Sequence, residues 1–426
     1  ESMGFWAVLG YVVERVYKVV LLLRLYILLR ATDRRQWKAQ GEGDTQETAE
    51  NAEALAKTMN GTLWNEFCDS FKDAGEVVMR EHILRGPHPE LDRIEGFRYL
   101  TRMLRGGLES YLEYADPLFP ELRKLPDLVK MGADNPDNYY QFATISGQCE
   151  YLISGSRGTI HYLGMGAYEG PYPGKKQNGG RAGYLEDKQL VVGADGYFEV
   201  VLSCRRPEGA GETVNWLPLT PEAEKLIVRQ TFNDHSKEEI AQLTLTCTSK
   251  PDGMRPANLL ACDLQRGLAG SAMLVNGAGH TFANWAEEWS KIPNELHTLA
   301  DNVSTGAWAD PNLLIYHGYW RIDADEALCI RASNIEADFF NFQLNNVWME
   351  SLDYRFYRVS VNGSEATMET QESVKIIVSY QKPSQAFKDE YGNHIETQGH
   401  LHGTMALRLA RPRRDPVIEI MKVHVF

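Results

Sequence analysis

The chain alternates between segments with helical periodicity and segments with strand periodicity. Apolar residues repeat at helix spacing between about residues 48 and 122, and again in 258–275 and 282–299. After a turn cluster at 134–138 the period changes to that of strands. Short strands are predicted at 139–145, 149–154, 158–163, 189–192, 197–202 and 225–232, and later at 313–322, 327–332, 339–347, 355–361, 374–379, 403–410 and 417–423. The pattern predicts an α+β protein with a helical N-terminal region followed by β-rich, jelly-roll-like domains with a helical insert.

The same pattern predicts where the chain divides. The 426 residues are enough for two or three separate cores. The expected parts are an amphipathic apolar helix and linker at 1–43, a helical domain at 44–130, a first β-rich domain at 131–235, a helical insert at 236–310 and a C-terminal β-rich domain at 311–426.

Residues 4–30 form the most apolar segment of the chain. On a helix, Glu14, Arg15 and Lys18 would share one face, with Arg24 at its edge. These charges shorten the uncharged apolar run, which favours a helix that lies in the membrane interface over one that spans the bilayer. Packing against the body or against another subunit is the alternative. The basic residues that follow would place the body at the cytoplasmic face of the inner membrane as a peripheral protein, and otherwise in the cytoplasm.

The net charge bears on possible partners, and the cysteines bear on whether disulfides form. The formal net charge of −14 repels phosphate backbones and disfavours nucleic-acid binding. The six cysteines contain no CxxC pair and are predicted to be buried, reduced thiols, although their even number also permits disulfides. The oligomeric state is left open.

The segment 339–347 carries the strongest candidate site. In a strand, Phe340, Phe342 and Leu344 would face the core, and the opposite face would be rich in amides. The candidate ligand-binding side chains here are Asn341, Gln343, Asn345, Trp348, Asp353 and Tyr354. Amides beside an indole and a phenol are typical of a polar, aromatic ligand cavity, and a solvated face is the alternative.

Arg229, His161 and a pair of histidines add further candidate ligand-binding or metal-binding residues. Arg229 is a lone guanidinium in an apolar strand, so its burial would require a partner. His161 is either a structural histidine or faces the same cavity as the amides. His400 and His402 could share a face and chelate a metal, but no carboxylate or third histidine lies close in sequence. No metal site and no cofactor are predicted.

Several blocks resemble a known family. The blocks GYWRIDADEALCIRA, DFFNFQLNNVWMESLDYR and TQGHLHGTMALRL resemble the C-terminal domain of the bacterial domain-of-unknown-function family 1214. Upstream blocks such as EGFRYLTRMLRGGLE extend the resemblance to about residues 60–426. The resemblance implies jelly-roll-type β domains with helices, and it implies no activity.

Three functions fit these observations. The first is a membrane-associated bacterial protein that binds a hydroxyl-bearing amphiphilic small molecule, such as a sterol, lipid or glycan-like compound, in a polar and aromatic pocket. The second is a hydrolase or lyase in the same pocket, with Asp353 or His161 as acid or base and Arg229 as an anion clamp. The third is an accessory subunit of a membrane complex, docked by residues 4–30.

Overall fold

The computed structural model describes residues 45–84, 86–124, 129–170, 180–208, 214–299 and 308–424. The predicted fold class is confirmed: the chain is an α+β protein in which a helical N-terminal region is followed by two β-sandwiches and a helix between them. The apolar segment 4–30 lies outside the described residues. Among the helices in the described ranges, none combines the length and the apolar character needed to cross a membrane.

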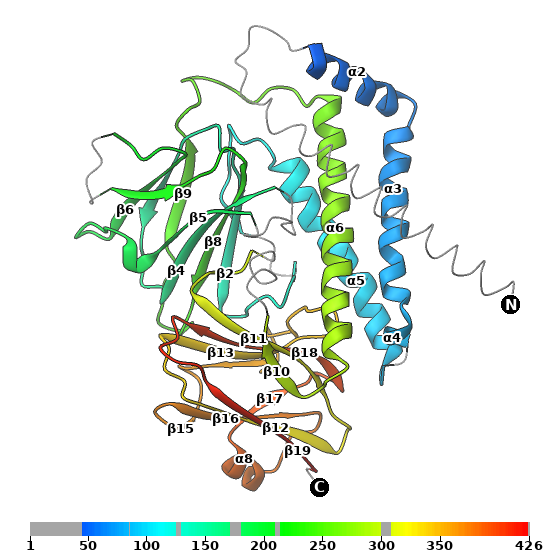
Figure 1. Cartoon of the computed structure of the whole chain (residues 1–426), viewed down its shortest axis with the longest axis vertical. Coiled ribbons are helices and arrows are strands. Elements are labelled where there is room, and N and C mark those ends of the chain that lie inside the picture. The colour runs from blue at the N-terminus through cyan, green and yellow to red at the C-terminus, as the bar shows by residue number, and fades with distance from the viewer. Residues whose placement is uncertain are drawn as a thin grey trace, which may run out of the picture.

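The helices from α2 to α6 form one layer along the side of the molecule (Figure 1). They are α2 (Thr45–Met59), α3 (Thr62–Gly75), α4 (Glu81–Leu84), α5 (Pro89–Leu108) and α6 (Ala261–Trp289), with short turns η1 (Glu76–Met79) and η2 (Glu109–Glu113). The two stripes predicted in 258–299 belong mainly to the single helix α6. Its glycines permit close contact with η2, because a Cβ on Gly267 or Gly270 would lie 2.8 Å from atoms of Leu112 or Tyr111.

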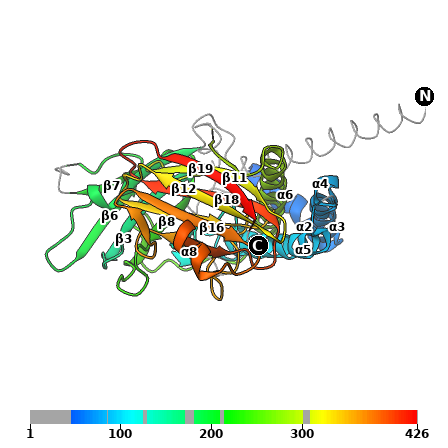
Figure 2. The ribbon, with the colours of Figure 1, turned by 90° about the horizontal axis from the view of Figure 1, so that it is seen from below.

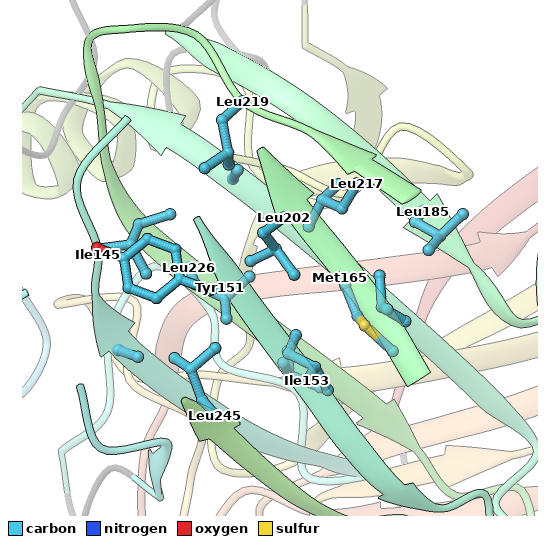
Figure 3. Packing of buried hydrophobic residues seen from close by; sticks show 14 of the residues in the cluster. Ile145, Tyr151, Ile153, Met165, Leu185, Leu202, Leu217, Leu219, Leu226 and Leu245 are labelled. Carbon is cyan, nitrogen blue, oxygen red and sulfur yellow. The ribbon is translucent and has the colours of Figure 1, made fainter. Parts of the chain in front are cut away.

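The first sandwich consists of two sheets that enclose an apolar core. Sheet A has the strand order β1-β2-β8-β4-β5, and the second sheet has the order β7-β6-β3-β9. The strands are β1 (Arg123–Lys124), β2 (Asn138–Thr144), β3 (Tyr151–Ser156), β4 (Tyr162–Glu169), β5 (Arg181–Glu186), β6 (Tyr197–Ser203), β7 (Asn215–Pro218), β8 (Ala223–Thr231) and β9 (Gln242–Cys247). Alternate residues of β3, β6 and β8, such as Ile153, Leu202 and Leu226, meet in this core (Figure 3).

The second sandwich repeats this arrangement. Sheet C has the order β10-β11-β18-β13-β14, and it faces a sheet of order β15-β16-β12-β19 in which β17 also pairs with β16. The elements are β10 (Glu295–Thr298), β11 (Leu313–Arg321), β12 (Glu326–Ser333), β13 (Phe339–Leu344), β14 (Ser360–Asn362), β15 (Met368–Thr370), β16 (Ser373–Ser379), α8 (Gln385–Tyr391), β17 (Asn393–Glu396), β18 (His402–Ala410) and β19 (Val417–His424). As predicted, Phe340, Phe342 and Leu344 lie in its core.

A third core joins the helices to both sandwiches. It contains Tyr168 and Ile227 from sheet A, Tyr319 from sheet C, and apolar side chains of α5 and α6. The faces of sheets A and C that point away from their own cores, here called outer faces, are therefore buried where they meet the helices. Figure 2 shows the helical layer beside the sandwiches from a second direction.

Some local predictions are wrong. Residues 189–192 do not form a strand, because the side chains of Glu186 and Gln189 cap the short helix η3 (Asp187–Gln189). The strand predicted at 355–361 is reduced to β14, since Asp353 accepts a hydrogen bond from the Arg355 backbone in a turn. The expected helical insert at 236–310 also contains β9 and β10.

All six cysteines are free. Four of them are buried, but Cys68 is partly exposed and Cys204 is exposed, so the prediction that every thiol is buried is wrong. Cys204 directly follows β6, outside the apolar core of the first sandwich.

Candidate functional site

A cavity of about 880 Å³ lies where the helical layer meets the outer faces of sheets A and C. This volume is within the range of about 300–1,000 Å³ typical of sites for small molecules. Its apolar lining includes Phe142, Ile227, Leu274, Phe282 and Trp285. Its polar lining includes Tyr140, Lys225, Arg229, His317, Tyr354 and Arg408. The cavity therefore offers an apolar surface and several cationic or hydrogen-bonding groups.

Arg229 projects from β8, the central strand of sheet A. Only 8% of the residue is exposed. Its Nη1 donates to the Tyr168 hydroxyl at 2.9 Å, and its Nη2 donates to the Trp308 carbonyl at 2.5 Å. The prediction that Arg229 is buried and partnered is confirmed. Its partners are neutral oxygens, and it forms no ion pair with any residue that the structure describes.

The glycines of β4 make room beside Arg229. Gly164 pairs with Arg229 across the ladder, and a Cβ on Gly164 would lie 2.0 Å from the Tyr184 hydroxyl oxygen. A Cβ on Gly166 would lie 2.6 Å from the Tyr168 hydroxyl oxygen. The two glycines therefore allow both phenols to lie across the outer face of sheet A, where Tyr168 can accept from Arg229.

Arg408 occupies the equivalent place in sheet C. It lies on the central strand β18, and 4% of the residue is exposed. Its Nη1 donates to Gln343 Oε1 at 2.5 Å, and its Nη2 donates to the Ala133 carbonyl. Within the described ranges it too has no carboxylate partner at ion-pair distance. Arg408 was not predicted as a site residue, although a lone arginine in the apolar run MALRLA has the same pattern as Arg229.

Each arginine donates to the carbonyl of a residue whose backbone has a strained conformation. Ala133 has φ 58° and Trp308 has φ 56°, which is the left-handed region that residues with a side chain rarely adopt. Such strain persists where the surrounding structure enforces it, and it is common at binding sites. Each guanidinium has five N–H donors, so hydrogen-bonding capacity remains on both.

His317 and Lys225 complete the polar lining. Burial, together with the charge of Arg408, lowers the pKa of His317 to about 3, so its imidazole is neutral. The ring stacks on Trp289 with centroids 5.2 Å apart, and its Nδ1 has no hydrogen-bond partner among the described residues. Burial lowers the pKa of Lys225 to about 8. Its Nζ donates to the Ser110 carbonyl and to Thr144 Oγ1.

The three amides predicted as ligand contacts are buried but do not line the cavity. Gln343 Nε2 donates to the Asp134 carbonyl at 2.9 Å and to Asn345 Oδ1 at 2.5 Å. Asn341 Nδ2 donates to Asp137 Oδ2 at 2.7 Å. The outer face of β13 is thus covered by the loop before β2, so the amides hold that loop and Arg408 in place.

The remaining predicted residues are dispersed. Tyr354 lines the cavity, with Lys130 Nζ 4.7 Å from its ring centroid. Trp348 is fully buried against the helices, where its Nε1 donates to the Asp92 carbonyl. Asp353 pairs with Arg355 at the surface, and His161 Nε2 donates to the Asp338 carbonyl. Neither Asp353 nor His161 lines the cavity, so neither is placed to act there as acid or base.

His400 and His402 join sheet C to helix α5. His402 Nε2 lies 2.9 Å from Asp92 Oδ2, and His400 Nε2 lies 2.9 Å from Glu95 Oε2. These four residues are here called the helix–sheet joint. The Tyr319 hydroxyl lies 2.5 Å from His402 Nδ1 on the other side of the ring. In the part of the chain that the structure describes, no cluster of three or more histidine, cysteine or acidic side chains could hold a metal ion.

Comparison with known proteins finds an informative relative among the solved structures. No protein-family model matches the chain. No curated protein matches it either. A solved structure of an uncharacterized protein from Burkholderia cenocepacia is 36% identical, with a TM-score of 0.79, and the match covers 87% of this chain and 99% of that one. The chain belongs to the same family as this protein.

A second solved structure, of a protein from Vibrio parahaemolyticus, is 10% identical with a TM-score of 0.42. That match covers 82% of this chain and 99% of the Vibrio chain, but the likeness is too weak to support an argument. The Burkholderia relative therefore supports the fold. The resemblance to family 1214 stays a prediction.

Proposed function

We propose that the chain binds an amphiphilic small molecule in the cavity between sheet A, sheet C and the helices. The observation that carries this proposal is the combination of an 880 Å³ volume with an apolar aromatic lining and the buried polar groups of β8, β11 and β18. A molecule with a flat or extended apolar body can pack against Phe142, Phe282 and Trp285. Its polar end can reach the strands that carry Arg229 and Arg408.

Hydroxyl-bearing amphiphiles suit this lining. His317 Nδ1, Tyr140 and Lys225 can exchange hydrogen bonds with hydroxyl groups without a full ion pair. Sterol-like, lipid-like and glycan-bearing molecules all combine such groups with apolar area. The proposal therefore keeps the ligand class predicted from the sequence and moves its site from the amides of β13 to the cavity.

The binding of decanol, a simple amphiphile, tests the proposal. Trp285 and Trp308 line the cavity, so binding is measured by tryptophan fluorescence and by titration calorimetry on the full chain. Ile315 lies opposite Arg408 in the ladder, so Ile315→Trp should obstruct the part of the cavity beside Arg408 and strongly weaken binding. Val417→Trp, on the exposed strand β19, is the matched control and should bind normally. Saturable binding that survives Ile315→Trp would place the ligand elsewhere.

We also propose that residues 4–30 bring the protein to the cytoplasmic face of a membrane as a peripheral protein. The support is the one-sided charge distribution of this apolar segment and the basic residues after it. The full chain should float with vesicles that contain anionic lipid, and a chain without residues 1–40 should stay soluble and folded. If the shortened chain aggregates while the full chain is monomeric without detergent, the segment belongs to the core.

A further inference from the structure

We infer that the polar end of the ligand is a single carboxylate, held between the guanidinium groups of Arg229 and Arg408. This inference rests on the proposed function and narrows its ligand class to amphiphilic carboxylic acids. The two arginines belong to sequence segments almost 180 residues apart, yet each lies on the central strand of a sheet whose outer face borders the same cavity.

The arrangement of the two arginines supports one shared anion. Tyr140 pairs with Arg229 across the ladder, and it lines the same cavity as both arginines. Each guanidinium is anchored by a backbone carbonyl and by one further neutral side-chain oxygen at 2.9 Å or less. The anchors fix the planes of both groups and leave N–H donors for a planar, two-oxygen acceptor.

Nearby charges indicate an anion with one charge. Asp310 raises the pKa of Arg229 through its charge, against the lowering effect of burial, and it accepts hydrogen bonds from Tyr162 and Tyr184. On the other side, Asp134 acts on Arg408 and accepts from the Ser351 backbone and hydroxyl. These two carboxylates equal the two guanidinium groups in number of charges. A doubly charged phosphate would therefore meet more repulsion at this site than a monoanionic carboxylate.

His317 gives an independent indication of a missing polar partner. The residue is 7% exposed and lines the cavity, and its Nδ1 has no hydrogen-bond partner in the described ranges. A buried polar nitrogen without a partner is costly. With its proton on Nδ1, the neutral ring could donate to a carboxylate oxygen beside Arg408, whose charge already acts on this histidine.

Three probes with the same alkyl chain test the inference: decanoate, decanol and decyl phosphate. At pH 8 and constant ionic strength, the full chain should bind decanoate about tenfold or more tightly than decanol, because only the acid gains charge-assisted hydrogen bonds. Decyl phosphate should bind more weakly than decanoate. Calorimetry gives the dissociation constants, and the comparison on the unaltered chain does not depend on whether any variant folds.

Variants then assign the effect to the two arginines. Arg408→Met and Arg229→Met should each bring the affinity for decanoate close to the affinity of the same variant for decanol, so that the ratio of the two affinities falls to about one. Arg331→Met is the matched control, because Arg331 is an exposed arginine on β12 that does not line the cavity. It should change neither affinity.

The outcomes separate the two proposals. Equal affinity for decanol and decanoate would contradict the inference that the ligand carries a carboxylate, but it would agree with the proposal that the cavity binds an amphiphile. Tighter binding of decyl phosphate than of decanoate would contradict the inference that the bound anion carries a single charge. Failure of all three probes to bind would overturn the proposed function and the inference together. A preference for decanoate that persists in both arginine variants would mean that the carboxylate does not bind at this pair of arginines.

Discussion

Strand β18 presents two ionisable side chains from the same outer face, and they meet very different surroundings. At one end, His402 lies between Asp92 of α5 and the hydroxyl of Tyr319. Six residues along, Arg408 is held by Gln343 and the Ala133 carbonyl and borders the cavity. Both side chains are almost completely buried. One has a charged partner supplied by the fold, and the other has only neutral oxygens.

The difference separates two uses of buried polarity. A buried ionisable group with its counterpart in place fixes how two elements dock, and removing either member leaves the other without compensation. A buried guanidinium held only by neutral acceptors is oriented without being neutralised. The helix–sheet joint is therefore expected to determine stability, and the Arg408 end is expected to determine what the cavity accepts.

The largest expected effect comes from breaking the joint. His402→Ala leaves the Asp92 carboxylate buried without its partner, and loss of one member of a buried pair costs about 3–5 kcal/mol. Urea denaturation measures the change in the free energy of unfolding. His424→Ala is the control, because His424 pairs with Asp325 at the exposed surface. A loss as small as that of the control would mean that the joint contributes little to stability.

Substitution of Gln343 tests the support of Arg408. Because Gln343 is fully buried and makes three side-chain hydrogen bonds, Gln343→Leu should lower the free energy of unfolding by about 1–3 kcal/mol and also weaken decanoate binding. Gln343→Glu should instead place a carboxylate beside Arg408 and selectively weaken decanoate, while decanol binds as before. Equal loss for both probes in Gln343→Glu would indicate a general distortion of the cavity.

The pair of Glu95 and His400 predicts a pH window. Burial alone would raise the pKa of Glu95, but the hydrogen bond and charge of His400 lower it below its ordinary value of 4.5. Burial alone would lower the pKa of His400, but Glu95 raises it above 6.5. The contribution of Glu95 is lost as pH falls below 4.5, and that of His400 is lost as pH rises above 6.5.

Stabilisation by this pair should therefore be greatest between pH 4.5 and 6.5. The experiment compares the free energy of unfolding of the wild-type chain and of His400→Gln across pH 4 to 8. The glutamine can still donate to Glu95 but does not titrate, so the difference between the two proteins should be largest inside the window and shrink on both sides. A difference that does not vary with pH would contradict these shifts.

The smallest effect is expected at Asp353. This residue is partly exposed and pairs with Arg355 two positions away, so Asp353→Asn should change the free energy of unfolding by less than about 0.5 kcal/mol. Binding of decanol and decanoate should not change, because Asp353 does not line the cavity. A large loss of binding would restore the role that its sequence position beside the amides suggested.

Local periodicity predicted much of the fold. The alternation in 339–344 assigned the phenylalanines to the core correctly, because a period of two is a property of the strand itself. It could not show what covers the amides. Their partners Asp134 and Asp137 lie about 200 residues upstream, in the loop before β2. A solvated face and a face buried under another segment have the same local pattern.

The site was predictable in part. Arg229 was found because an arginine among apolar strand residues needs a partner, and the same reasoning applied to Arg408 would have found the second wall of the cavity. The joint was harder to find. Asp92 and Glu95 are three apart on α5, and His400 and His402 are two apart, so each pair shares a face. Only the packing of α5 on sheet C shows that these two faces meet.

The division of the cavity between two sandwiches has a further consequence for how the protein unfolds. No single sandwich carries the complete binding surface, so a ligand that bridges Arg229 and Arg408 acts as a non-covalent cross-link between the two sandwiches. Ligand binding then stabilises the assembled pair of sandwiches. This stabilisation grows with the logarithm of the ligand concentration. A scanning calorimeter should show two overlapping transitions for the empty protein approaching one another, and finally merging, as a bridging acid is added.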